Sequence, residues 1–246
     1  MFLSSLPNEF LPISKSRQEK INSIWRELLE ARDILVIGPG LKEITPENLP
    51  QHFSHILYID GGAKHFHHPL LQTWRTHSLV IGDKDSFNEL KNHHDIEFDL
   101  ELPPQKDESD LSFALKLLSP KVRNMTLLGF SGGRFDHELS NLGVLDDFLN
   151  YAHSESPIEI TIDQSLKIFG PGKKTIQYHG TFSLFSFKTQ LLTIEGDIEY
   201  PVTEKTTFKT LHSLGLSNKA HGKVIINSEA NILVIFPAKD RRHLLF

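Results

Sequence analysis

The sequence predicts an α/β protein in which an N-terminal parallel-sheet α/β domain is followed by a C-terminal antiparallel β-sandwich domain. In the first part of the chain, short apolar runs that end in glycine or aspartate alternate with helical patterns, as in parallel sheets covered by helices on both faces. After the polar segment Ser154–Pro157, short β-branched and aromatic runs are separated by turn residues. We therefore predict a boundary in this segment, with domains over residues 1–154 and 155–246.

The predicted N-terminal domain begins with an amphipathic helix over residues 16–32, because its large apolar side chains recur at helical spacing. Apolar runs follow, and each is expected to be a buried parallel strand. These expected strands cover residues 34–37, 56–59, 79–81 and 125–128. Leucines at helical spacing predict two further helices, over residues 110–118 and 136–149.

The predicted C-terminal domain contains short runs typical of antiparallel strands. They lie at residues 158–162, 181–187, 191–194, 223–226 and 232–236. A small antiparallel sandwich or barrel is the simplest arrangement that buries one face of each run.

The composition excludes several classes of function. A formal net charge of −5 argues against nucleic acid as a partner, because phosphate backbones require clustered Lys and Arg. The chain has no cysteine and therefore neither disulfides nor thiolate metal sites. Residues 1–10 have no basic residue ahead of an apolar run, and no apolar stretch reaches the roughly 20 residues that span a bilayer. We expect a cytoplasmic protein without a membrane partner. The histidine pairs at 67–68 and 93–94 lack the ligand spacing of a zinc site, and we interpret them as exposed loop residues.

Carboxylates follow two of the predicted strands, at the edge of the sheet where ligands bind in such folds. The segment Asp60-Gly61-Gly62 comes directly after the run at 56–59, and its glycines allow a ligand to approach the backbone closely, although Asp-Gly-Gly is also ordinary turn chemistry. Asp83 and Asp85 lie two residues apart after the run at 79–81. Carboxylates crowded in this way repel each other unless a cation joins them, and Mg²⁺ would keep phosphate oxygens in its shell. A solvated turn with a helix cap is the alternative.

A third acidic cluster contains Asp107 and Asp110, which flank the start of the helix predicted at 110–118. Capping by Ser109 or Asp110 explains part of this cluster but leaves Asp107 without a role. The glycine-rich loop at 129–137 is the most specific single motif, because its backbone N–H groups and the following helix N-terminus form an anion site. Arg134 in this loop adds planar, bidentate recognition of phosphate.

Together these motifs resemble those of the thiamine pyrophosphokinase family. The resemblance is carried, in this order, by Asp-Gly-Gly-Ala at 60–63, Gly-Asp-Lys-Asp-Ser at 82–86, Asp-Glu-Ser-Asp at 107–110 and Gly-Gly-Arg-Phe-Asp-His at 132–137. Leu-Ser-Asn at 216–218 resembles the Ser-Asn pair of the family's thiamine-side domain, so the likeness covers both halves of the chain.

The resemblance implies a homodimer that transfers diphosphate from ATP to the hydroxyl of thiamine, with sites between subunits. It implies that ATP is bound by Asp60, Gly61, Gly62, Gly132, Gly133 and Arg134. It implies that Asp83, Asp85, Asp107 and Asp110 organise Mg²⁺ and, with Arg134 and Asp136, form the catalytic set. Thiamine would be held by Asp136, His137, Ser217 and Asn218.

The chain departs from the family pattern at two places. Lys64 and His65 stand where the family usually has Asn and Arg, and Gly196–Tyr200 replaces a Gly-Leu-Lys-Tyr stretch with an extra residue and a reversed charge. Two alternatives therefore stay open. One is a pyrophosphokinase that acts on another small alcohol, such as a pterin, and the other is a nucleotide-binding regulatory protein without turnover.

Overall fold

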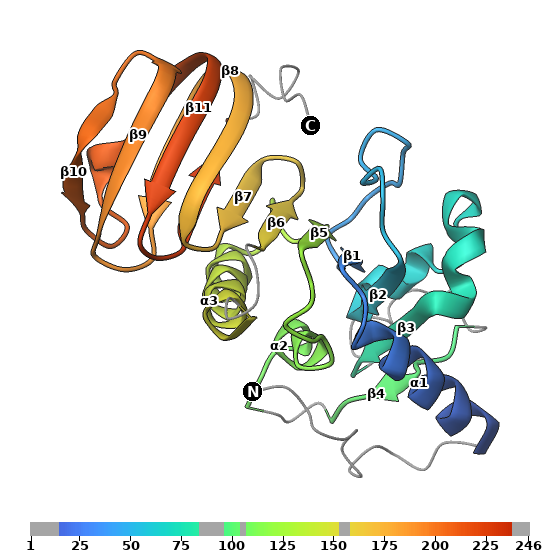
Figure 1. Ribbon diagram of the computed structural model, residues 1–246. Coiled ribbons are helices and arrows are strands. Elements are labelled where there is room, and N and C mark those ends of the chain that lie inside the picture. Colours follow the sequence, from blue (N-terminus) through green and yellow to red (C-terminus); the bar gives the residue numbers. More distant parts are fainter. Residues whose placement is uncertain (1–14, 84–95, 104–106, 153–157, 238–246) are drawn as a thin grey trace. The chain divides into compact units, whose positions relative to one another are not determined.

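The structure is a computed structural model and describes residues 15–83, 96–103, 107–152 and 158–237 (Figure 1). The chain divides into two compact units, Met1–Ser156 and Pro157–Phe246. The segment in which the sequence predicts the boundary, Ser154–Pro157, lies outside the described residues.

The first unit is built on a parallel sheet with the strand order β5-β1-β2-β3-β4. Its strands are β1 (Asp33–Ile37), β2 (His55–Ile59), β3 (Ser78–Gly82), β4 (Leu100–Glu101) and β5 (Asn124–Leu128). Its helices are α1 (Lys15–Leu28), α2 (Asp110–Leu115), α3 (Phe135–Ala152) and the two 3₁₀ helices η1 (Asp60–His65) and η2 (Pro69–His77).

The central strands of this sheet are buried along their length, which explains why they are continuous apolar runs. Every residue of β2 and β3 is buried, as are the last four residues of β1. The amphipathic helix α1 buries Ile21, Ile24 and Leu28 and packs against β3. Four strands and the helix at the start of the domain are thus confirmed.

The helix predicted over residues 110–118 is shorter than expected, because α2 ends at Leu115. The next three backbone N–H groups donate to carbonyls three residues back, as in Leu118 N–H to the Leu115 carbonyl at 3.1 Å. Pro120 follows closely, and a proline disfavours helical conformation in the residue before it. At the other end the side chain of Ser109 accepts a hydrogen bond from the N–H of Ser112 at 3.1 Å, which confirms the predicted cap.

The second unit is an antiparallel β-sandwich with the strand order β10-β9-β11-β8-β12-β7-β6. Its strands are β6 (Glu159–Ile162), β7 (Leu166–Phe169), β8 (Gly172–Ser186), β9 (Gln190–Ile198), β10 (Val202–Phe208), β11 (Asn218–Ser228) and β12 (Ile232–Ile235), and η3 (Ser213–Gly215) is a short 3₁₀ turn. The long strand β8 joins the two layers. Residues 172–182 pair with β11, and residues 183–186 pair with β12.

Three parts of the second unit are not predicted from the sequence. One is β7, which has only four residues. Another is the start of β8, where exposed residues alternate with half-buried ones and with the buried Tyr178, so residues 172–180 contain no continuous apolar run. Strand β10 lies at the end of the strand order and has the largely polar sequence Val-Thr-Glu-Lys-Thr-Thr-Phe. An edge strand of this kind needs little apolar surface, and its polar side chains discourage pairing with another chain.

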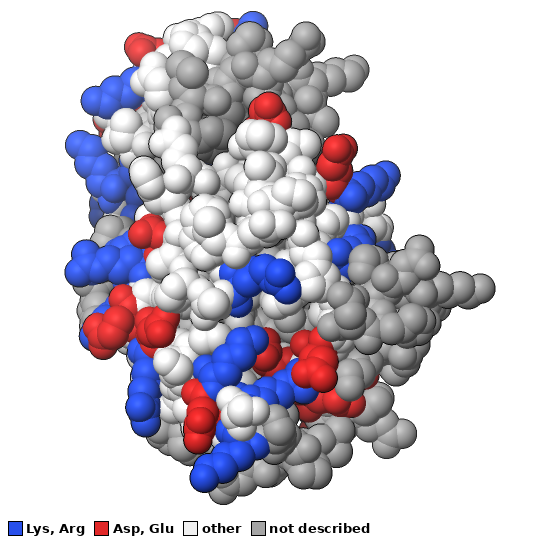
Figure 2. Space-filling view, turned by 90° about the vertical axis from the view of Figure 1, so that its right-hand side faces the viewer, with Lys and Arg blue, Asp and Glu red and all other residues white. Residues whose placement is uncertain are grey.

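No helix among the described residues has both the length and the apolar character that a membrane span requires. On the face that Figure 2 presents, basic and acidic side chains are interspersed.

Candidate active site

Three carboxylates converge at the carboxyl ends of the parallel strands. Asp60 follows β2, Asp83 follows β3 and Asp110 is the first residue of α2. Their carboxylate oxygens all lie within 4.8 Å of one another. Three like charges at this separation repel each other strongly unless a cation lies among them. An all-oxygen donor set at a phosphate-binding edge fits Mg²⁺, which prefers carboxylate and phosphate oxygens.

Asp60 combines an unusual backbone conformation with a buried side chain. Its φ angle is +47°, in the left-handed region that aspartate tolerates better than most residues. The side chain is only 9% exposed, and its Oδ1 has no hydrogen-bond partner among the described residues. A buried carboxylate oxygen without a donor costs free energy, and a bound cation would remove that cost. The structure therefore supports a ligand role for Asp60, where the sequence predicts an ATP contact.

The two glycines after Asp60 are buried within η1 and do not line the pocket described below. A Cβ atom on Gly62 would lie 2.1 Å from the carbonyl oxygen of Ile37. The glycine thus lets η1 pack directly against the end of β1, which holds Asp60 in place. This is an indirect contribution to the site, and the direct contact of Gly61 and Gly62 with ATP stays a prediction.

The glycine-rich loop connects β5 to α3, and both Gly129 and Gly132 have a φ of +82°. At Gly129 a Cβ atom would lie 2.2 Å from the backbone nitrogen of Leu41, so only glycine fits there. The N–H of Gly133 donates to a carboxylate oxygen of Glu138 at 2.8 Å. The carboxylate of Glu138, in the first turn of α3, therefore already accepts a hydrogen bond from one backbone N–H group of the predicted anion site.

Arg134 pairs with Asp136 in this loop. The guanidinium Nη2 lies 2.6 Å from Oδ2 of Asp136, and Nε lies 3.2 Å from Oδ1. The side chains are 73% and 65% exposed, so water screens the pair. The hydrogen bonds from Arg134 lower the pKa of Asp136 to about 2. The guanidinium of Arg134 in this loop is thus already paired with the carboxylate of Asp136.

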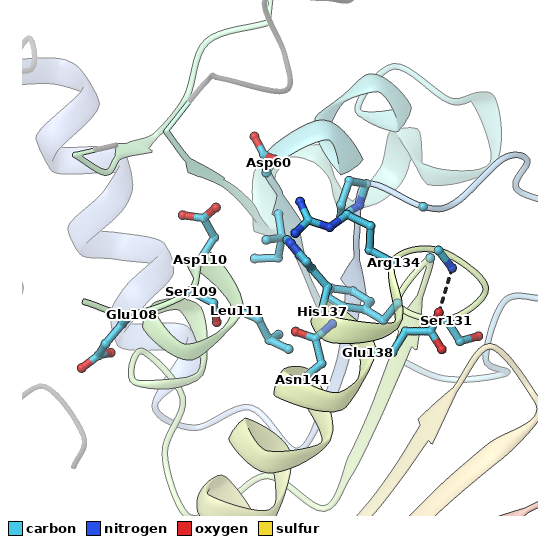
Figure 3. Close-up of a pocket in the computed structure, with 16 residues that line it drawn as sticks. Asp60, Glu108, Ser109, Asp110, Leu111, Ser131, Arg134, His137, Glu138 and Asn141 are labelled. Carbon is cyan, nitrogen blue, oxygen red and sulfur yellow. Dashed lines mark hydrogen bonds between the residues drawn. The ribbon is translucent and has the colours of Figure 1, made fainter. Parts of the chain in front are cut away.

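These elements surround a pocket of about 650 Å³ within the first unit (Figure 3). Four residues that the sequence analysis singles out line it: Asp60, Asp110, Arg134 and His137, together with the backbone of Gly133. Gly132 and Asp136 do not line it. Glu108, from the Asp-Glu-Ser-Asp motif, also lines it, as do two polar residues of α3 that the motifs do not include, Glu138 and Asn141. The helical spacing of Glu138 and Asn141 from His137 is a signal that could have identified these two.

The remaining predicted metal ligands are placed differently. Asp85 lies outside the described residues. Asp107 is exposed and is not part of the cluster formed by Asp60, Asp83 and Asp110.

The residues predicted to bind thiamine in the second unit have distinct environments. Ser217 is exposed, with a φ of +54°, and its N–H donates to the hydroxyl of Ser183. Asn218 is buried, and its side-chain amide hydrogen-bonds the backbone of Tyr200. Asn218 therefore anchors, through Tyr200, the segment 196–200 in which the sequence departs from the family pattern.

Comparison with protein families identifies the first unit. Residues 47–160 match the model of the thiamin pyrophosphokinase catalytic domain. This range contains the carboxylate cluster and the glycine-rich loop. A comparison with curated proteins found no match.

Solved structures share the fold over most of the chain. Thiamine pyrophosphokinase from Bacillus subtilis is 20% identical, with a TM-score of 0.60 over 83% of this chain and 99% of that one. The enzyme from Geobacillus thermodenitrificans is 21% identical, with a TM-score of 0.58 over 85% of this chain and 99% of that one. Thiamin pyrophosphokinase from Candida albicans is 16% identical, with a TM-score of 0.58 over 84% of this chain and 89% of that one. Residues 47–160 therefore belong to the thiamin pyrophosphokinase catalytic-domain family, and over the rest of the chain the likeness to these structures is one of fold.

Proposed function

We propose that this protein transfers the diphosphate group of ATP to the hydroxyl group of thiamine, giving thiamine diphosphate and AMP. The observation that carries the proposal is that Asp60, Asp110 and an arginine-bearing glycine loop line one pocket within the matched catalytic domain, with the carboxylate of Asp83 clustered beside those of Asp60 and Asp110. Such a pocket offers ligands for a metal–phosphate complex and donors for phosphate oxygens. The reaction needs little covalent chemistry from the protein, so positioning and charge neutralisation supply most of the catalysis.

In the proposed reaction the hydroxyl oxygen of thiamine bonds to the β-phosphorus of ATP. The bond from that phosphorus to the oxygen bridging the α-phosphate breaks, AMP leaves with the bridging oxygen, and the hydroxyl proton is released. Arg134 leaves Asp136 to hold two phosphate oxygens with its planar fork. When bound, Mg²⁺ neutralises charge that builds up on the phosphate oxygens. Asp60, Asp83 and Asp110 are the residues that would hold it, with Asp85 and Asp107 as further candidates.

The two units have different proposed roles. Residues 1–154 would bind ATP and Mg²⁺, and residues 155–246 would contribute to thiamine binding, with Ser217 as the exposed contact. We also propose a homodimer in the cytoplasm, since the family resemblance implies sites between subunits. Light scattering coupled to size-exclusion chromatography tests the dimer, and a fully active monomer would contradict the shared site.

The experiment that tests the activity incubates the purified protein with Mg²⁺, ATP and thiamine and separates the products. We expect AMP and thiamine diphosphate in equal amounts. Asp110→Asn should abolish both products, whereas Asp147→Asn, on the exposed side of α3, should not. Formation of AMP with a pterin alcohol but not with thiamine would show that the acceptor is the pterin alcohol and not thiamine. Absence of AMP with either acceptor would indicate a binding protein without turnover.

A further inference from the structure

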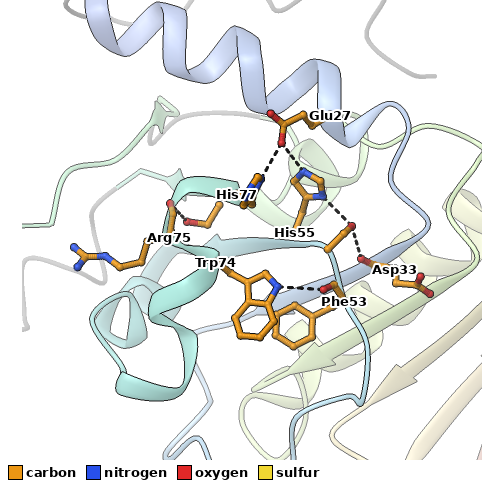
Figure 4. A network of polar contacts seen from close by, with 9 residues as sticks. Glu27, Asp33, Phe53, His55, Trp74, Arg75 and His77 are labelled. Carbon is orange, nitrogen blue, oxygen red and sulfur yellow. Dashed lines mark hydrogen bonds and ion pairs between the residues drawn. The ribbon is translucent and has the colours of Figure 1, made fainter.

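A second cluster of side chains that could hold a metal ion lies in the first unit (Figure 4). It consists of Glu27 on α1, His55 at the first residue of β2 and His77 at the last residue of η2, directly before β3. Because β2 and β3 are parallel, His55 and His77 lie at their amino ends, whereas Asp60 and Asp83 follow their carboxyl ends. The proposed diphosphate transfer makes no use of this cluster.

The donor atoms of the cluster have the spacing of a metal site. Oε2 of Glu27 lies 3.2 Å from Nε2 of His55 and 2.9 Å from Nδ1 of His77. All three donor atoms lie within 4.8 Å of one another, and the two imidazole rings are perpendicular with centroids 5.6 Å apart. A tetrahedral ion with bonds of 2.0–2.1 Å to nitrogen and oxygen separates its ligand atoms by about 3.3 Å. Small side-chain movements would therefore bring all three donors onto one ion.

The hydrogen-bond chain behind His55 fixes its tautomer. The hydroxyl of Ser54 donates to the carbonyl of Asp33 at 3.1 Å, because a carbonyl can only accept. Ser54 Oγ must therefore accept from Nδ1 of His55, which lies 2.9 Å away. In neutral His55 the proton is then on Nδ1, and Nε2 presents a lone pair to the carboxylate of Glu27. Metal-binding histidines are oriented by a partner of this kind on their other nitrogen.

Two acceptors would then face each other across 3.2 Å. His55 is 7% exposed, so its ring has little access to water that could bridge the two groups. A cation between the ring nitrogen and the carboxylate oxygen would satisfy both acceptors.

The surroundings leave room for a water ligand. The cluster borders a cavity of about 860 Å³, and the side chains of Glu27 and His77 are 42% and 48% exposed. The other charged groups lining the cavity are balanced in sign: Arg26, Glu30, Arg32 and Asp33. A divalent ion can thus enter from solvent and keep water in its fourth position.

We propose that Glu27, His55 and His77 bind a divalent transition-metal ion of the zinc class, with water as the fourth ligand. Two imidazoles and one carboxylate suit zinc and its neighbours better than Mg²⁺, which prefers an all-oxygen shell. The ion would join α1 to the amino ends of β2 and β3 and so stabilise the first unit. It would bind without ATP or thiamine, so this site stands or falls independently of the proposed transferase activity.

The test uses the full chain without a polyhistidine tag, freed of metal and titrated with Co²⁺ and then Zn²⁺. We expect the visible absorption of tetrahedral Co²⁺, its loss on addition of one equivalent of Zn²⁺, and a higher melting temperature with Zn²⁺. His77→Gln should weaken Zn²⁺ binding by at least about tenfold, and Ser54→Ala, which removes only the partner of His55, by about 10–100-fold. His52→Gln is the control, because His52 is an exposed histidine close by in sequence and should bind like the wild type.

Two results would overturn the site. One is Zn²⁺ binding by His77→Gln as tight as that of the wild type. The other is the absence of both the Co²⁺ spectrum and the Zn²⁺ stabilisation in the wild-type chain.

Discussion

The side-chain amide of Asn218 holds both backbone groups of Tyr200. Its Oδ1 accepts from the Tyr200 N–H at 3.1 Å, and its Nδ2 donates to the Tyr200 carbonyl at 2.8 Å. The same Oδ1 also accepts from the N–H of Lys219 at 2.8 Å. Asn218 therefore ties the turn between β9 and β10 to the start of β11.

Asn218→Ala should destabilise the second unit, because it leaves these backbone groups without their partner in a buried position. We expect a loss of about 1–3 kcal/mol in the free energy of unfolding, measured by urea denaturation. Ser217→Ala is the matched control and should unfold like the wild type, since the Ser217 side chain is exposed. If Asn218→Ala instead leaves stability unchanged and raises only the KM for thiamine, the residue contacts substrate.

Arg134→Lys should reduce turnover without affecting folding. Lysine keeps the charge but loses the fork that holds two phosphate oxygens. We expect kcat/KM for thiamine to fall about tenfold to hundredfold, as for the loss of one charge-assisted hydrogen bond, with an unchanged melting temperature. Arg26→Lys, an exposed arginine on α1, is the control. Unchanged kcat/KM in Arg134→Lys would restrict Arg134 to pairing with Asp136.

The carboxyl group of Asp136 should titrate at about pH 2, because Arg134 stabilises its charged form. A lowered pKa in the folded state means that the pair's contribution is complete above the ordinary value of 3.8 and is lost as the pH falls toward 2. That contribution is small because both groups are exposed. Carboxyl carbon NMR should show the midpoint of Asp136 moving up toward 3.8 in Arg134→Gln. A midpoint that does not move would exclude the pairing in solution.

Asp60→Asn should separate metal binding from folding. Asparagine keeps the size of the side chain and tolerates a positive φ, but it removes one of three crowded negative charges. Without metal, we expect the variant to melt at a higher temperature than the wild type, because the repulsion is relieved. Added Mg²⁺ should stabilise the wild type more than the variant. Equal stabilisation of both proteins by Mg²⁺ would remove Asp60 from the metal site.

Gly62→Ala should destabilise the first unit by about 1–3 kcal/mol, the usual cost of overpacking. The added methyl group would lie 2.1 Å from a backbone oxygen of β1, which cannot give way like a flexible side chain. Gly143→Ala is the matched control, because no atom lies within 4 Å of its added Cβ and it is exposed within α3. It should stabilise the protein by about 0.5–1 kcal/mol through helix propensity. Chemical denaturation of both variants measures the difference.

The fold was predictable where burial imposes a continuous apolar pattern. Strands β1, β2, β3 and β5 are largely buried, and their apolar runs predict them directly from the sequence. The helical spacing of apolar residues does the same for α1. The start of β8 and the edge strand β10 were not predictable, because a strand exposed on one face or at an edge carries mostly polar residues.

The candidate site was predictable to the extent that parallel strands end at one edge. That rule brings Asp60 and Asp83 together, whereas Asp110 joins them from the start of α2. It does not distinguish a metal ligand from a phosphate contact, so the proposed ligand role of Asp60 rests on its burial. The cluster of Glu27, His55 and His77 follows no local motif, because its members come from three separate elements.

The position of β11 in the second unit has a consequence for biosynthesis. Strand β8 pairs only with β11 and β12 among the described strands, and β11 also lies between β8 and β9. As the chain leaves the ribosome, the fifteen residues of β8 therefore have no partner among the described strands until β11 has been made. An unpaired edge of this length invites association with other nascent chains. Chaperone binding during translation should accordingly concentrate on the interval between the synthesis of β8 and that of β11.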